Sequence, residues 1–136
     1  MLQKKIEVSH GELFDKLSIL VIKSEKIEDE EKLRNVNYEL AMLGEVMGSW
    51  SDWHIKTVDF YEKLEAVNRK LWNVEDEIRF LDSAVFHSSC PEKLKMEYMR
   101  LARSVYILND QRAELKKHIN IVNKSAIVEE KSYNKE

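Results

Sequence analysis

Two stripes of polar and aromatic residues in the second half of the sequence have the chemistry of an anion-binding surface. Within each stripe the residues follow one another in steps of three and four, which places their side chains on one face of an α-helix. The stripes comprise Glu65, Asn68, Trp72, Glu75 and Arg79 in the first segment, and Ala102, Tyr106, Asn109, Ala113 and Lys116 in the second.

Arg112 stands where an apolar residue is expected. The surrounding apolar positions repeat in alternating steps of three and four, the spacing of a helix that packs against another helix. If residues 53–85 and 91–122 fold back on each other, Arg112 faces Leu64 and Glu65, Asn68 comes near Asn109, and Trp72 comes near Tyr106. The two polar stripes then form one shared face.

This shared face has two interpretations. In the first, an earlier helix lies across it, and Asp15, Lys16 or Lys23 meets its polar groups, since buried charges must be paired. In the second, it is a pocket in which cations receive an anionic ligand above two aromatic rings, because the arginine fork suits carboxylate or phosphate. The candidate anion-binding face consists of Lys23, Asn68, Trp72, Glu75, Arg79, Tyr106, Asn109, Arg112 and Lys116.

The sequence predicts no catalytic residue, no metal site and no cofactor. The four histidines, at positions 10, 54, 87 and 118, lie on separate segments without the paired spacing of metal ligands. His87 and Cys90 lie close enough for a catalytic pair, but two polar residues in one tight connection are ordinary. The acidic run at residues 28–31 suits the start of a helix better than a cation site.

The elements that position these residues are four predicted helices in one domain spanning residues 1–136. Ser9 and Glu12 form a capping box that opens the first helix, and the second begins near Asp29. The other two are expected over residues 53–85 and 91–122, with Pro91 as a first helical residue. The fold class is therefore all-α, an antiparallel bundle of about four helices dominated by a long helical hairpin.

Two further segments carry predictions of their own. The tail, residues 124–136, is predicted to be flexible or loosely packed, or to place residues 126–128 against residues 5–8 as a short strand. Trp50 and Trp53, in the loop before the third helix, are expected to cap the end of the bundle.

The composition of the chain argues against nucleic acid and membranes as partners. The net charge of −3 lacks the basic excess that nucleic acid demands, and no segment approaches the length of about 20 apolar residues that crosses a bilayer. The first ten residues have no apolar core of a signal peptide. Cys90 has no partner cysteine in the chain, which fits a reducing cytoplasm.

The sequence also resembles a family of small uncharacterised bacterial proteins, classed as a domain of unknown function. The resemblance rests on the strings S-H-G-E-L-F-D-K-L-S-I-L-V-I-K, V-N-R-K-L-W-N-V-E-D-E-I-R, L-N-D-Q-R-A-E-L-K-K-H-I-N and S-A-I-V-E-E-K-S-Y. Relatives usually carry proline at the position of His10. The resemblance implies an all-helical fold and supplies no activity.

We therefore expect a non-enzymatic helical interaction or assembly module that forms a homodimer, because two short helices cover little of so long a hairpin. The alternative is a small all-α enzyme or anion-binding protein that uses the face at Trp72 and Tyr106, with an unknown protein partner or a small anionic ligand.

Overall fold

The structure is a computed structural model, and it describes residues 1–133. Helix follows helix along the chain: α1 spans His10–Lys26, α2 Glu30–Met47, α3 Thr57–Val85 and α4 Glu92–Val122, with a 3-10 turn, η1, at Trp50–Asp52. No strand occurs within these residues. The all-α prediction is confirmed.

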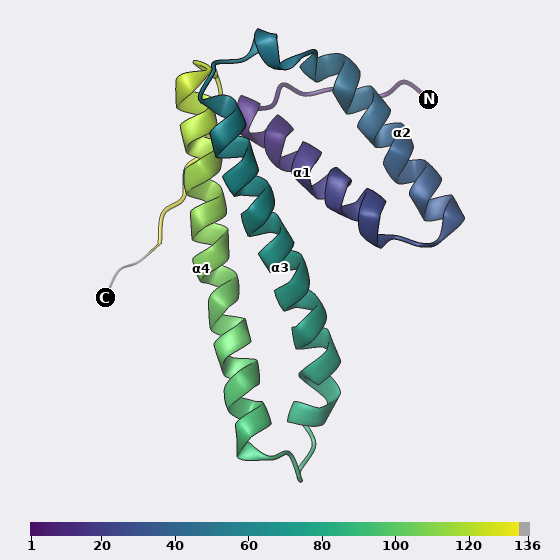
Figure 1. Cartoon of the computed structure of the whole chain (residues 1–136), viewed down its shortest axis with the longest axis vertical. Coiled ribbons are helices and arrows are strands. Elements are labelled where there is room, and N and C mark those ends of the chain that lie inside the picture. The colour runs from purple at the N-terminus through teal and green to yellow at the C-terminus, as the bar shows by residue number, and fades with distance from the viewer. Residues whose placement is uncertain (134–136) are drawn as a thin grey trace.

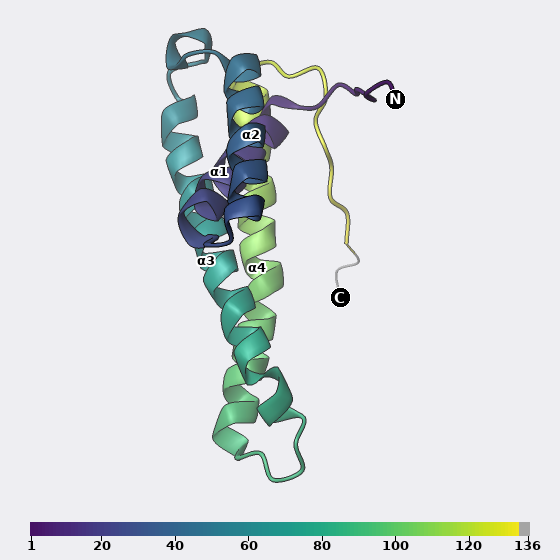
Figure 2. The same ribbon diagram turned by 90° about the vertical axis from the view of Figure 1, so that its right-hand side faces the viewer.

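The long hairpin of α3 and α4 forms the body of the molecule (Figure 1). Helices α1 and α2 form a shorter hairpin beside one half of it, and α1 lies against both α3 and α4 (Figures 1 and 2). We call this the covered half of the hairpin. The distal half, residues 73–85 and 92–107, extends past α1 and includes the connection at residues 86–91.

Local sequence explains where the first two helices begin and end. The Ser9 hydroxyl accepts a hydrogen bond from the amide of Glu12, at 3.1 Å, and the Asp29 carboxylate accepts one from the amide of Lys32, at 2.9 Å. Each satisfies an otherwise unpaired first-turn amide. Gly48 ends α2 with a φ of 70°, a conformation that glycine adopts without a side-chain penalty.

Helix α3 begins at Thr57, four residues later than predicted. The side chain of Asp52 accepts a hydrogen bond from the amide of Ser49 in η1, and the indole N–H of Trp53 donates to the carbonyl of Met47 at 2.9 Å. These contacts fold residues 49–53 back onto the end of α2, so the chain cannot enter α3 there.

The core lies where α1, α2 and the covered half of the hairpin meet. Phe14 of α1, Leu64 of α3 and Ile119 of α4 are fully buried, and Val36 and Leu43 of α2 are buried beside them. Trp50 stacks on Phe14 with ring centroids 5.6 Å apart, and Trp53 meets Phe14 edge to face at 4.7 Å. The two tryptophans therefore close this end of the bundle, as expected.

The tail runs back along α4 without forming the short strand predicted for residues 126–128 (Figure 2). The Ser125 hydroxyl accepts a hydrogen bond from the amide of His10. Lys131 lies 3.4 Å from the Asp110 carboxylate on α4. Side-chain pairing to α4 thus replaces backbone pairing to residues 5–8. Residues 134–136, which the tail prediction also included, lie outside the described residues.

Candidate functional site

The Arg112 guanidinium forms a two-pronged ion pair with Asp15 of α1. Its Nε lies 2.8 Å from Asp15 Oδ1, and its Nη2 lies 2.5 Å from Asp15 Oδ2. The Asp15 side chain is only 1% exposed, whereas that of Arg112 is 29% exposed. Hydrogen bonding to Asp15 raises the pKa of Arg112 above its ordinary value. Arginine is well suited to this pairing because its planar fork matches a carboxylate.

Asn68 of α3 completes the coordination of Asp15. Its amide nitrogen donates to Asp15 Oδ1 at 2.9 Å and to the Ser18 hydroxyl at 2.6 Å. The Ser18 hydroxyl in turn donates to the backbone carbonyl of Asp15. All three side chains are buried. Because the buried carboxylate accepts bonds from two other helices, it ties α1, α3 and α4 together at one point.

One turn earlier, α1 approaches α4 closely. The Gly11 amide donates to the Asn120 side chain at 2.6 Å, and a Cβ on Gly11 would collide with the backbone carbonyl of Lys116. The Glu12 carboxylate lies 2.6 Å from Lys116 Nζ. Only the Ser9 half of the predicted capping box is thus paired as expected, because Glu12 reaches across to α4.

The tail adds a third acidic group at this end. Glu129 lies 3.4 Å from the amide nitrogen of Asn120. Partial burial works to raise the pKa of Glu129, but hydrogen bonds from Ser9 and Asn120, with the charge of Lys116, outweigh it and lower the pKa. We call the set Ser9, Gly11, Glu12, Asp15, Ser18, Asn68, Arg112, Lys116, Asn120 and Glu129 the polar junction.

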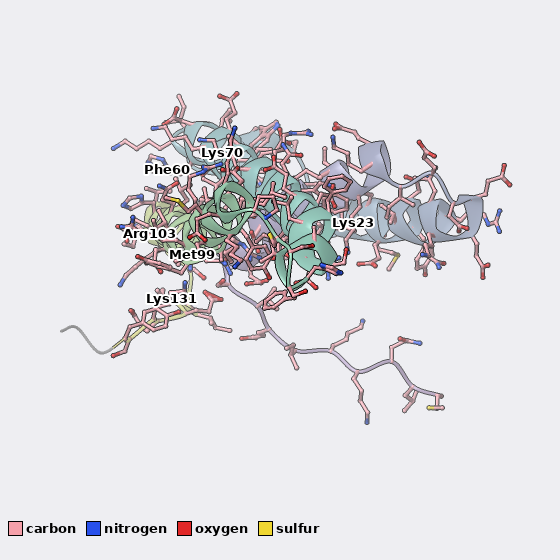
Figure 3. The ribbon with its side chains drawn as sticks, turned by 90° about the horizontal axis from the view of Figure 1, so that it is seen from below. Lys23, Phe60, Lys70, Met99, Arg103 and Lys131 are labelled. Carbon is pink, nitrogen blue, oxygen red and sulfur yellow. The ribbon has the colours of Figure 1, made fainter. Side chains whose placement is uncertain are left out.

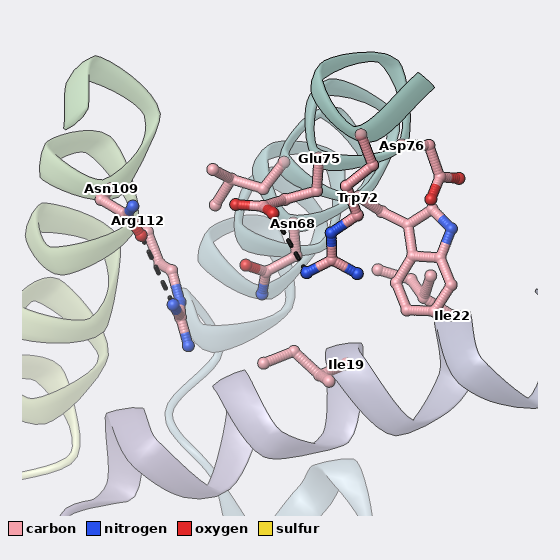
Figure 4. Close-up of a pocket in the computed structure, with 10 residues that line it drawn as sticks. Ile19, Ile22, Asn68, Trp72, Glu75, Asp76, Asn109 and Arg112 are labelled. Atoms are coloured by element: carbon pink, nitrogen blue, oxygen red, sulfur yellow. Dashed lines mark hydrogen bonds and ion pairs between the residues drawn. The ribbon is translucent and has the colours of Figure 1, made fainter. Parts of the chain in front are cut away.

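Beside the polar junction lies a cavity of about 410 Å³, under the C-terminal half of α1 (Figure 4). Ile19 and Ile22 of α1 face Trp72 across it, and Asn68 and Arg112 form its inner end. Its other lining residues are Leu71, Glu75, Asp76, Arg79 and Asn109. With Glu75 and Asp76 opposing Arg79 and Arg112, the formal charges of the lining cancel.

The structure brings six of the nine candidate residues to this cavity, and these are Asn68, Trp72, Glu75, Arg79, Asn109 and Arg112. Arg79 lies 3.5 Å from Glu75, one turn away on α3. Lys23, Tyr106 and Lys116 do not line the cavity. Tyr106 is 56% exposed, and Lys116 is committed to Glu12. Glu65, which the antiparallel register is predicted to place opposite Arg112, contacts Tyr61 and Arg69 instead.

The sequence offers Asp15, Lys16 and Lys23 as residues of the first helix that could meet the polar face, and in the structure Asp15 pairs with Arg112. Ser18, Asn120 and Glu129 were not foreseen as members of a polar cluster. Ser18 lies within an apolar run, and Asn120 and Glu129 are separated from the first helix by most of the chain. Their membership of the cluster becomes visible only in the folded chain, where they lie near Asn68 and Lys116.

His87 and Cys90, which the sequence places close together, bond to different partners. The His87 ring bonds to the Ser89 hydroxyl at 2.8 Å, while the Cys90 thiol is directed to the Pro91 carbonyl. Within residues 1–133, no group of three or more histidine, cysteine, aspartate or glutamate side chains could hold a metal ion. Nor does any helix in this range have the length and apolar character needed to cross a membrane.

Comparison with known proteins gives one match. A family model described as "Family of unknown function (DUF6165)" matches residues 4–136. No curated protein and no solved structure matches the chain.

Proposed function

The chain belongs to the family of unknown function DUF6165, and we propose that it is a non-enzymatic assembly module that works as a homodimer. The observation that carries this proposal is the contrast between the two halves of the long hairpin. In the covered half, seam residues such as Leu64, Leu108 and Ile119 are buried. In the distal half, Leu101 is buried as well, but Val74, Ile78 and Leu94 are only half-buried.

Large apolar side chains are also exposed along the distal half. Phe80 is 84% exposed, and Phe86, Met96 and Met99 are each more than half exposed. Large apolar side chains that are exposed together in one part of a protein favour a contact with another macromolecule there. A two-helix layer buries its apolar side chains only when a further layer covers it, and α1 is too short to supply that layer (Figure 1).

The state of the cations favours this proposal over anion binding. Arg112 is neutralised by Asp15, and Lys116 by Glu12. Arg79 lies beside Glu75. An anion entering the cavity would therefore have to compete with carboxylates already in place, one of which is buried and accepts hydrogen bonds from two side chains.

The experiment for this proposal is a molar-mass measurement by light scattering on purified full-length chain. We expect a mass of twice the 16.1 kDa of one chain at micromolar concentration. A monomeric mass at that concentration would refute the homodimer.

A second candidate function rests on the cavity at Trp72. Its volume, about 410 Å³, is within the usual range for small-molecule sites, roughly 300–1,000 Å³. Arg112 Nη1 makes only a long contact, 3.5 Å to Asn109 Oδ1, so it has capacity for another acceptor. A small carboxylate or phosphate compound could bind there, for transport of that compound or for chemistry on it.

This second candidate is tested by calorimetric titration with inorganic phosphate and with succinate. Saturable heat in the millimolar range that disappears in Arg79→Ala would support it. Absence of saturable binding to either probe would end it, and Arg103→Ala is the matched control because Arg103 is exposed and lies away from the cavity.

We further infer that the protein is bacterial and works in the cytoplasm. The first inference rests on the resemblance of its motif strings. The second rests on Cys90, the one cysteine in the sequence, which is unpaired in the structure as reducing compartments favour.

A further inference from the structure

The hairpin has a second broad surface, on the side away from α1 and the tail. We call it the back face and define it by Lys63, Ala66, Lys70 and Glu77 on α3 and Arg100, Ile107, Gln111 and Glu114 on α4. Figure 3 shows Lys70 on the side of the hairpin opposite Lys131 of the tail. No described helix covers this face.

The covered half of the back face contains a shallow cavity of about 620 Å³. Ala66, Val67 and Leu115 supply its apolar floor, and Lys70 and Glu114 are among the charged residues at its edge. A small side chain at position 66 leaves this space open. The cavity is large enough to admit an aromatic ring from another molecule.

Phe80 is the complementary feature of the distal half. It is 84% exposed, more than any other aromatic side chain in the described chain, and it borders a smaller hollow with Leu81 and Glu97. Along α3 it follows Ala66 by fourteen residues, about four helical turns or 21 Å. An exposed ring and an open apolar cavity thus lie on one helix, equidistant from a point near Asn73.

We propose that a second copy of the chain packs antiparallel on the back face, about a two-fold axis near Asn73 and Ser104, with Phe80 of each copy in the cavity at Ala66 of the other. This inference rests on the proposed function, since it specifies the interface of that homodimer. A two-fold axis makes the contact twice, as a closed dimer requires. In this dimer the two hairpins form two stacked layers of two helices each. The distal half of each copy is then covered by the other copy.

The charges on α3 fit this arrangement. Near Ala66 the back face carries Lys70 and also Lys63, which is paired with Asp59 at 3.0 Å, and near Phe80 it carries Glu77. The proposed axis brings the basic half of α3 in one copy opposite the acidic half of α3 in the other. Opposite charges on facing surfaces favour the correct pairing and suppress wrong ones.

The charges on α4 reverse about the same axis. On the back face, Arg100 lies in the distal half of α4, where it pairs with Glu97 at 2.6 Å, and Glu114 lies in the covered half. A parallel dimer would also match charges, between α3 of one copy and α4 of the other, but it would place Phe80 far from the cavity at Ala66. The position of Phe80 therefore selects the antiparallel dimer.

Sedimentation equilibrium on full-length protein tests the aromatic contact. Phe80→Ala is expected to raise the dimer dissociation constant by about 30-fold or more, the loss typical of a buried aromatic anchor. The matched control is Phe86→Ala, which removes another exposed phenylalanine at the tip of the hairpin, outside the proposed interface. It should leave the dissociation constant unchanged. Circular dichroism checks that both variants stay helical.

A charge exchange tests the orientation. Lys70→Glu and Glu77→Lys should each weaken the dimer at least several-fold, because each brings like charges together across the axis. The double variant should restore most of the affinity, since Lys70 of one copy faces Glu77 of the other. In a parallel dimer, the two changes would instead add their losses.

The outcomes separate this inference from the proposed function. A dimer that withstands Phe80→Ala, or whose charge double variant is weaker than either single variant, overturns the inference and leaves the homodimer standing. A monomeric wild-type chain overturns both, as does a monomer that holds a different protein through Phe80.

Discussion

Asp15 and Arg112 form the central contact of the polar junction, joining α1 to α4 through two hydrogen bonds between a buried carboxylate and a half-buried guanidinium. The arginine that interrupts the apolar seam of α4 is therefore a partner for α1. Its position fixes where α1 crosses the long hairpin, and the cavity at Trp72 is the space that this crossing leaves open.

Replacing one member of the ion pair should lower the free energy of unfolding more than replacing both members. Arg112→Leu leaves the Asp15 carboxylate buried beside Asn68, with Lys116 as far as 3.9 Å away, so we expect a loss of about 3–5 kcal/mol in the free energy of unfolding. The double variant Asp15→Leu with Arg112→Leu should recover most of that loss, since it leaves no unpaired charge. Urea denaturation of the four chains measures the coupling. Equal losses in the single and double variants would contradict it.

The close approach of α1 to α4 at Gly11 gives a second prediction. Gly11→Ala places a methyl group against the backbone of Lys116, and the rigid neighbour should make this cost about 1–3 kcal/mol. The matched control is Gly44→Ala in α2, where a Cβ meets nothing within 4 Å. There the substitution should stabilise the protein by about 0.5–1 kcal/mol, because alanine favours the helix. Thermal unfolding of both variants shows the contrast, and a stabilised Gly11→Ala chain would refute the contact.

The indole of Trp53 predicts a smaller effect. Trp53→Phe keeps an aromatic ring beside Phe14, which Trp53 meets edge to face, but removes the hydrogen bond to the Met47 carbonyl. We expect a loss of about 1 kcal/mol in the free energy of unfolding. Trp50→Phe is the control, since Trp50 stacks on Phe14 and the structure records no hydrogen bond from its indole. Losses of the same size in both variants would assign the effect to ring size.

Glu129 predicts a pH dependence. Its pKa is lowered in the folded chain, so its carboxylate stabilises the fold at pH values above the unfolded pKa of about 4.3. This contribution should be lost as the pH falls through the folded pKa. Glu129→Gln should therefore be less stable than wild type at pH 7, and the difference should shrink as the pH falls below about 4.3. A difference that stays constant as the pH falls would show that the carboxylate charge is not involved.

The sequence predicted the elements well where the signals were local. The caps at Ser9 and Asp29 and the glycine at position 48 each act within one helical turn, so their effects are legible in a few residues. The start of α3 was misplaced because Trp53 bonds to a carbonyl six residues earlier, a contact that periodicity does not encode.

The polar junction was only partly predictable for a related reason. Helical spacing put Asn68, Trp72, Asn109 and Arg112 on one face, and the structure places them there. It could not identify Asp15 as the partner, because Asp15, Lys16 and Lys23 were all within reach until the crossing point of α1 was known. That point depends on Gly11, whose missing side chain allows α1 to approach the backbone of α4.

The most direct test of the central claim, that the distal half of the hairpin is covered in a dimer, is hydrogen exchange measured over a range of protein concentrations. Amides in residues 73–85 and 92–107 should exchange more slowly as the concentration rises through the dissociation constant, because self-association protects helices that are otherwise free to open. Amides of α1 near Phe14, in the core of each single chain, should respond much less. Exchange in the distal half that is fast at every concentration would contradict the claim.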